Sequence, residues 1–256
     1  DDTMIIGTSG RYEFKNKGIN VYLEALNRLT RDKNLKKDVL AFINVPGWVG
    51  EVREDLRERL DSGKDYDTPL ECPFITHWLH NMSHDQVLDM LKYLNMSNSV
   101  DTKVKVVFVP CYLDGKDGIL NELYYDLLIG TDLSVYPSYY EPWGYTPLES
   151  IAFKVPTITT DLAGFGLWVN SLTGKNATLQ DGVKVIHRTD YNYSEVADTI
   201  KDTISEFSSL TSTEINKIRK NAANIAEKAL WKHFIQYYYE AYDIALRNAA
   251  KRLSLN

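Results

Sequence analysis

The chain has 256 residues, of which 44% are hydrophobic and 25% are charged, and its formal net charge at pH 7 is -6. This composition is typical of a soluble globular protein, and the length suits one large α/β domain or two small ones. The acidic balance argues against nucleic acid as a partner, the interspersed charges argue against an anionic membrane surface, and no apolar run approaches the ~20 residues of a membrane-spanning helix.

The cysteines and the first residues bear on compartment and completeness. Cys72 and Cys111 are the only cysteines and show no metal-ligand spacing, which favours a reducing, cytoplasmic compartment. Residues 1–3 lack the charged and apolar regions of a signal peptide. Because the chain has no initiator methionine and enters a strand almost at once, we expect it to be a mature fragment or an excised domain.

Strands and helices are predicted to alternate along most of the chain. Apolar runs bounded by glycine, proline or polar residues predict six strands, at about 4–6, 39–45, 103–109, 133–136, 155–160 and 183–186. Amphipathic patterns predict helices at about 18–29, 120–128, 149–154 and 194–207. This alternation predicts an α/β fold with a doubly wound, Rossmann-like parallel sheet, whose right-handed crossovers bring the strand exit loops to one edge.

Residues 48–99 interrupt this alternation and predict a helical insertion that caps the sheet. Three histidines fall inside it, at spacings close to those of helical metal ligands: His77, His80 and His84. No acidic partner is obvious beside them, so we predict no metal site.

Helices are also predicted over about 211–253. Thr211 and Glu214 form a capping box that begins the first of them. The last helix carries large side chains at helical spacing, for which core or domain-interface packing is predicted: Trp231, Phe234, Tyr238, Tyr242 and Leu246.

The segment 137–149 follows the fourth predicted strand and carries the strongest ligand-site signal. Its two prolines end the strand, and Gly144 allows a tight turn. The sequence Thr-Pro-Leu-Glu that starts at Thr146 predicts a helix start, with Thr146 as N-cap and Glu149 completing a capping box. Bare N–H groups at such a helix start, at the ligand-binding edge of an α/β sheet, favour a phosphate.

Two glutamates, Glu141 and Glu149, bracket this turn. An ionised carboxylate only accepts hydrogen bonds, so sugar or ribose hydroxyls are natural partners for both. The alternative is that Glu149 only caps its helix and that Glu141 is an ordinary loop acid.

The loop after the first strand is basic, with Arg11, Lys15 and Lys17 ahead of a predicted helix. Cations there oppose the helix dipole, which makes sense if an anion binds beside them; the alternative is a solvated basic loop. Neither a Walker A sequence nor Gly-x-Gly-x-x-Gly follows the strand, so a P-loop NTPase or a nicotinamide dehydrogenase is disfavoured.

Residues 9–18, Ser-Gly-Arg-Tyr-Glu-Phe-Lys-Asn-Lys-Gly, resemble the phosphate-binding loop of animal and fungal glycogen synthases, glycosyltransferase family 3. Residues 137–149 and 156–166 resemble that family's most distinctive stretch, and 76–82 resembles another segment less closely. The matches occur in the family's order over most of the chain. The resemblance implies the C-terminal, nucleotide-sugar-binding half of a GT-B glycosyltransferase, forming a single domain over 1–256.

The family's arginine-rich regulatory stretch corresponds to 217–223, Lys-Ile-Arg-Lys-Asn-Ala-Ala, where the basic cluster is thinned. We therefore expect a bacterial member of the family in which activation by glucose 6-phosphate is doubtful.

The resemblance implies roles for individual residues. Arg11 and Lys17 would pair with the donor diphosphate, and Glu149 would bind the ribose hydroxyls. Glu141 would face the transferred glucose as nucleophile or stabiliser, and no metal or other cofactor is expected. The other implied contacts are uracil stacking by Tyr124 and phosphate binding by the backbone around Gly144, Tyr145 and Thr146.

The implied function is retaining transfer of glucose from UDP-glucose to the non-reducing end of an α-1,4-glucan. The implied partners are the UDP-sugar, the glucan acceptor and an N-terminal GT-B domain, in a full-length protein expected to be a homo-oligomer, and we expect the isolated chain to be inactive. Two alternatives stay open: a retaining GT-B enzyme of another family with a different acceptor, and a non-catalytic module that binds a nucleotide sugar. UDP and ADP are not distinguished with certainty.

Overall fold

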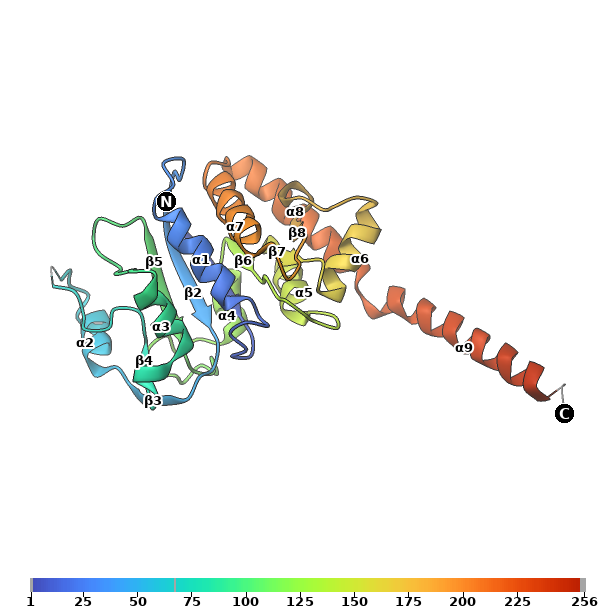
Figure 1. Ribbon diagram of the computed structural model, residues 1–256, viewed down its shortest axis with the longest axis horizontal. Helices are drawn as coiled ribbons and strands as arrows, with labels where there is room; N and C mark the ends of the chain where they lie inside the picture. The colour runs from blue at the N-terminus through green and yellow to red at the C-terminus, as the bar shows by residue number, and fades with distance from the viewer. Residues whose placement is uncertain (1, 67, 254–256) are drawn as a thin grey trace.

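The computed structural model describes residues 2–66 and 68–253 (Figure 1). Its main sheet has six parallel strands in the order β5-β2-β1-β6-β7-β8. The strands are β1 (Thr3–Ser9), β2 (Asp38–Asn44), β5 (Val104–Val109), β6 (Leu133–Val135), β7 (Thr157–Thr160) and β8 (Val183–Ile186). Counted within this sheet the order is 3-2-1-4-5-6, the order of Rossmann folds, which confirms the predicted fold class.

Helices cover both faces of this sheet. On one face, α1 (Ile19–Leu29) packs against α3 (Gln86–Tyr93) and α7 (Tyr193–Ser208). The connections after β5, β6 and β7 carry α4 (Tyr124–Ile129), α5 (Tyr145–Ala152) and α6 (Gly164–Thr173), and α8 (Ser212–Lys228) packs against α5. Right-handed crossovers place this second group on the opposite face, because the strand order reverses between β1 and β6.

Burial alternates along the central strands. In β2, Val39, Ala41 and Ile43 are at most 1% exposed, while the residues between them are half-buried. They pack with the apolar face of α1, where Leu23 and Leu26 are fully buried. This apolar burial supplies the main driving force for the fold.

Residues 48–99 contain more than the predicted helices. A two-stranded antiparallel sheet of β3 (Val49–Val52) and β4 (His77–Leu79) lies there, together with α2 (Glu54–Ser62), the short 3-10 helix η1 (Met82–His84) and α3. Two strands of four and three residues are too short to show a period in the sequence.

No helix was predicted between the strands at 155–160 and 183–186, where the structure has α6. The helix begins at Gly164 and includes Gly166, and glycine is a poor helix former. The capping box of Thr211 and Glu214 at the start of α8 is confirmed.

The last helix, α9 (Trp231–Leu253), extends away from the rest of the molecule (Figure 1). None of its residues is buried, and Tyr242 and Leu246 are 57% and 68% exposed. The prediction that its aromatic stripe packs into the core of this chain is therefore wrong, and the alternative of a domain interface stays a prediction. Over residues 2–66 and 68–253, no helix is long and apolar enough to cross a membrane.

Candidate functional site

The exit loops of β1 and β6 meet at the point where the strand order of the sheet reverses. The Tyr139 N–H donates to the Asn16 carbonyl oxygen at 2.7 Å, which fastens one loop to the other. The predicted convergence of these two loops is confirmed, and such a reversal point is where α/β sheets bind ligands.

Lys17 and Glu141 form an ion pair across this junction, between the Lys17 ammonium and Glu141 Oε1. The two side chains are 13% and 12% exposed, so solvent screens the pair only partly. The sequence assigned a phosphate to Lys17 and a sugar to Glu141, and the structure brings the two side chains into contact.

The backbone of Glu141 is held by the exit loop of β7. The Glu141 N–H donates to the Leu162 carbonyl at 3.3 Å, and the Gly164 N–H donates to the Glu141 carbonyl at 3.1 Å. A Cβ on Gly164 would lie 2.2 Å from the Pro142 carbonyl oxygen, so only glycine fits at this approach. The position of the Glu141 carboxylate is thus set by three exit loops, those of β1, β6 and β7.

The helix start beside Glu141 differs from the prediction. Helix α5 begins at Tyr145, with Gly144 as its N-cap at a φ of 106°, and no side chain caps it. The predicted capping box of Thr146 and Glu149 is therefore wrong, because the left-handed backbone at Gly144 starts the helix earlier. The N–H groups of Tyr145 and Thr146 have no acceptor within the helix, and the Glu149 carboxylate is not used as a cap.

Glu149 lies next to α4, the helix that carries Tyr124. The negative charge of Glu149 raises the pKa of the neighbouring Tyr125, with burial as a smaller cause. The Tyr125 ring stacks on Phe153 at 5.2 Å and lies 5.2 Å from the Tyr124 ring. The structure therefore groups Glu149 with Tyr124, and it adds Tyr125, which the sequence did not single out.

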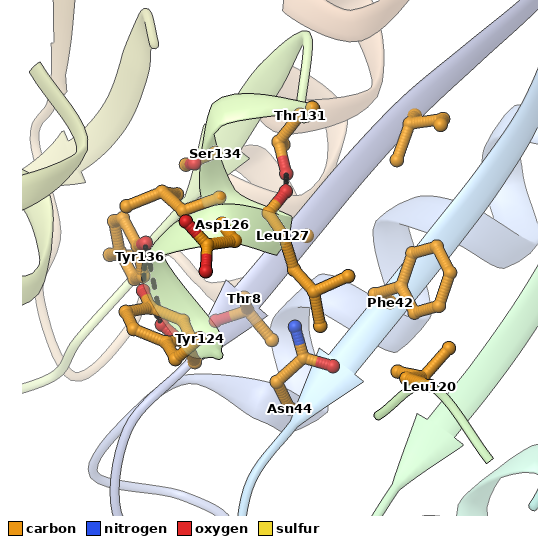
Figure 2. A pocket seen from close by; sticks show the side chains of 15 residues that line it. Thr8, Phe42, Asn44, Leu120, Tyr124, Asp126, Leu127, Thr131, Ser134 and Tyr136 are labelled. Carbon is orange, nitrogen blue, oxygen red and sulfur yellow. Dashed lines mark hydrogen bonds between the residues drawn. The ribbon is translucent and has the colours of Figure 1, made fainter. Parts of the chain in front are cut away.

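The phenol of Tyr124 belongs to a hydroxyl cluster at the end of β1. Its oxygen lies 2.6 Å from Ser9 Oγ and 3.4 Å from the Tyr136 oxygen (Figure 2). Burial raises the pKa of Tyr124, and the neighbouring Tyr136 raises it further. These contacts fix Tyr124 at the edge of a mainly apolar cavity of about 220 Å³. The Asn44 side chain also lines this cavity (Figure 2).

Arg11 stands apart from this arrangement. Its side chain is 75% exposed, and its Nε lies 2.8 Å from the Glu13 carboxylate. The structure does not bring Arg11 to the Lys17–Glu141 pair, and its contact with a diphosphate stays a prediction.

Among the described residues, one group has the spacing to hold a metal ion: His77, Cys111 and Asp117. His77 already uses both ring nitrogens, because Nε2 donates to the Asp117 carbonyl oxygen at 2.7 Å and Nδ1 accepts from Thr76. Burial raises the pKa of Cys111 to about 12, which keeps it a neutral thiol. The hydrogen bonds of His77 and the neutral thiol of Cys111 favour a structural role for this group over metal binding. His80 and His84 do not belong to the group.

Residues 56–253 match the family profile described as glycogen synthase. The chain is 27% identical over 306 residues to glycogen [starch] synthase isoform 2 of Saccharomyces cerevisiae, with 96% of this chain and 43% of that protein covered. It is 27% identical over 305 residues to glycogen [starch] synthase of Neurospora crassa, with 97% and 42% covered. The chain thus spans less than half the length of these curated relatives.

The chain also resembles a solved structure over its whole length. That structure is the α,α-trehalose-phosphate synthase (UDP-forming) from Burkholderia vietnamiensis, with a TM-score of 0.57, 10% identity and 46% of that protein covered. At this identity the match shows a shared fold, that of one half of a GT-B glycosyltransferase.

Proposed function

The chain belongs to the glycogen synthase family, and on that premise we propose that it is the donor-binding half of a retaining glycogen synthase. The whole enzyme would transfer glucose from UDP-glucose to the non-reducing end of an α-1,4-glucan. The observation that carries the proposal is the Lys17–Glu141 pair, because it sets a cation for the diphosphate against a carboxylate for the sugar.

In this proposal the diphosphate leaving group gains negative charge as the glycosidic bond to glucose breaks. Lys17 and the free N–H groups at the start of α5 are fixed donors that stabilise this charge where it develops. When the diphosphate pairs with Lys17, the Glu141 carboxylate is released from its ion pair and can face the glucose. The anomeric carbon of that glucose becomes oxocarbenium-like as the bond breaks. Glu141 then acts as nucleophile or as electrostatic stabiliser.

The nucleoside end of the donor would lie over α4 and α5. Glu149 would accept hydrogen bonds from the ribose hydroxyls, and Tyr124 would stack on uracil. Two observations support this arrangement: Glu149 does not cap its helix, and its charge acts on the tyrosines of α4. A ring anchored through its hydroxyl loses little conformational entropy when it stacks on a base.

The other half of the relatives' length would supply the opposite wall of the cleft. The surface proposed for that half is the aromatic cluster where Trp143 meets Phe234, at 5.5 Å, and the exposed side chains of α9 that continue it. A homo-oligomer and a cytoplasmic location are proposed for the whole enzyme. The isolated chain is expected to bind the donor without turning it over.

Calorimetric titration with UDP and ADP tests the donor site. UDP should bind selectively over ADP. Lys17→Ala should make the binding free energy of UDP less favourable by about 1.5–3 kcal/mol, which is tenfold or more in Kd. Lys33→Ala, at an exposed lysine outside the site, is the matched control and should leave the affinity unchanged. Unchanged UDP affinity in Lys17→Ala would sink the assignment of this loop, and selective ADP binding would change the proposed donor.

The alternatives are separated on the full-length protein. Transfer of glucose to a sugar other than a glucan would place the enzyme's acceptor outside the proposed function. UDP binding without any transfer would favour a non-catalytic module. Robust transfer by the isolated 256-residue chain would contradict the proposal that half of the cleft lies elsewhere.

A further inference from the structure

A second cavity of about 420 Å³, lined by residues with polar or charged groups, lies next to the junction of the β1 and β6 exit loops. Its walls come from these two loops, from the first turn of α1 and from the segment between β8 and α7. Asn16 and Tyr139, the residues whose backbones join the two loops, both line it. Its volume lies in the range of small-molecule sites.

The base of this cavity is a buried arginine. Arg188 is 6% exposed, and within the described part of the chain its guanidinium makes no ion pair with a carboxylate. It donates to the Pro137 carbonyl oxygen and lies 5.4 Å from the centre of the Tyr139 ring. Burial lowers the pKa of Arg188. A buried charge without an opposite charge is unfavourable, and most of the five guanidinium N–H donors are left for a ligand.

An unused acceptor lies in the same cavity. The Oδ1 atom of Asn20 is buried and, among the residues described, has no hydrogen-bond donor. The nearby Tyr193 hydroxyl donates elsewhere, to the Asn20 backbone carbonyl at 3.1 Å. Buried polar atoms are nearly always paired, so this atom calls for an O–H or N–H group from a ligand.

The remaining charges at the cavity favour an anion. Lys15 and Asp190 line its exposed rim, one of each sign. The Asp161 carboxylate serves other groups, because it accepts the Arg188 backbone N–H at 2.9 Å and pairs with His187 Nδ1 at 2.6 Å. Two cations, Arg188 and Lys15, therefore face the cavity against one exposed carboxylate.

We propose that this cavity binds the phosphoryl group of a small hydroxylated molecule, at a site separate from that of the donor diphosphate. The planar guanidinium of Arg188 matches two phosphoryl oxygens, and Lys15 adds charge at the rim. A hydroxyl group of the ligand donates to Asn20 Oδ1. Free phosphate shares the phosphoryl chemistry but lacks this hydroxyl, so the two sources can be told apart.

The test is a calorimetric titration of the chain with fructose 6-phosphate, inorganic phosphate and fructose. Fructose 6-phosphate should bind with a Kd of about 1 mM or lower, and fructose should not bind. Weaker binding of inorganic phosphate supports the hydroxyl contact, and equal binding assigns the site to free phosphate. Absence of binding by both phosphates at concentrations well above that Kd overturns the proposal.

Variants locate the bound phosphate. Lys15→Glu should weaken the binding of both phosphates about tenfold or more through charge reversal. Asn20→Leu should weaken the binding of fructose 6-phosphate severalfold, and it removes no existing hydrogen bond at Oδ1. Asn81→Leu is the matched control, because Asn81 Oδ1 is also buried without a partner but lies outside the cavity. Circular dichroism checks that each variant folds, so the test does not depend on replacing Arg188.

Lys17→Ala separates this site from the proposed function. This substitution should weaken the binding of UDP and leave the binding of fructose 6-phosphate unchanged. If Lys17→Ala abolishes binding of the phosphate ester while Lys15→Glu and Asn20→Leu do not change it, the phosphate lies at the donor site and the proposal is wrong.

Discussion

Gly18 and Pro137 approach so closely that no side chain fits between them. A Cβ on Gly18 would lie 2.0 Å from the Pro137 carbonyl oxygen, which also accepts the hydrogen bond from Arg188. The φ of Gly18 is 71°, in the left-handed region. Together with the Tyr139–Asn16 hydrogen bond, this close approach holds the loop that carries Lys17 against the loop that carries Glu141.

Gly18→Ala is therefore expected to destabilise the chain by at least about 3 kcal/mol, which combines left-handed strain with a backbone clash. Gly174→Ala is the matched control, because Gly174 has a φ of 67° and nothing within 4 Å of its Cβ position. Its loss should be about 1–2 kcal/mol, from strain alone. Urea unfolding of both variants measures the difference, and equal losses would contradict the close contact.

Glu141→Gln should have opposite effects on binding and on transfer. In the structure Glu141 neutralises Lys17, so removal of its charge frees the ammonium for the diphosphate. UDP should bind about fivefold more tightly, by ~1 kcal/mol, whereas transfer by the full-length enzyme should nearly vanish. Titration and a transfer assay on the same variant check the two effects. Weaker UDP binding would show that Glu141 does not compete for Lys17.

Two threonines predicted as helix caps should respond differently to substitution. Thr211 accepts the Glu214 N–H at 3.3 Å, so Thr211→Ala should lower the free energy of unfolding by about 1 kcal/mol. Thr146 lies inside α5 and caps nothing, so Thr146→Ala should change it by less than about 0.5 kcal/mol. Urea titration measures both changes. A loss of about 1 kcal/mol in the free energy of unfolding of Thr146→Ala would contradict the structure and support a capping box at Thr146.

The chain should lose stability as the pH rises above 10. Burial raises the pKa of Tyr193 from 10.0 to about 12, so the unfolded state releases this proton first. The resulting stability is complete below pH 10 and is lost between pH 10 and about 12. Urea midpoints across this range should fall, and Tyr193→Phe should make the fall less steep. An unchanged slope in that variant would show that Tyr193 does not contribute to this loss of stability.

The sheet was predictable because its strands are local patterns. The run around Leu133 is apolar and ends at a proline, and the other strands are bounded in similar ways. The sequence also singled out Lys17 and Glu141 as candidates, because each lies in a loop that follows a strand. The parallel topology then brings those loops together without any further information.

What the sequence did not reveal depends on contacts between distant residues. Glycine is needed at 164 because the backbone of Pro142, in another loop, lies too close for a side chain. The hydrophobic pattern of a helix contains no information about such contacts between distant residues. Arg188 was not singled out from the sequence, since its burial depends on the Pro137 loop 51 residues away along the chain. Local propensity likewise placed the start of α5 at Thr146, because it could not show the left-handed backbone at Gly144.

The 23 residues of α9 also determine how the chain responds to heat. Beyond its first turn, where Phe234 packs on Trp143, this helix gains little packing energy, so its helical content declines gradually with temperature instead of in one step. The sheet and its packed helices unfold cooperatively at a higher temperature. Far-ultraviolet circular dichroism therefore follows two processes in this chain, and the steepness of the transition in that signal underestimates the cooperativity of the sheet.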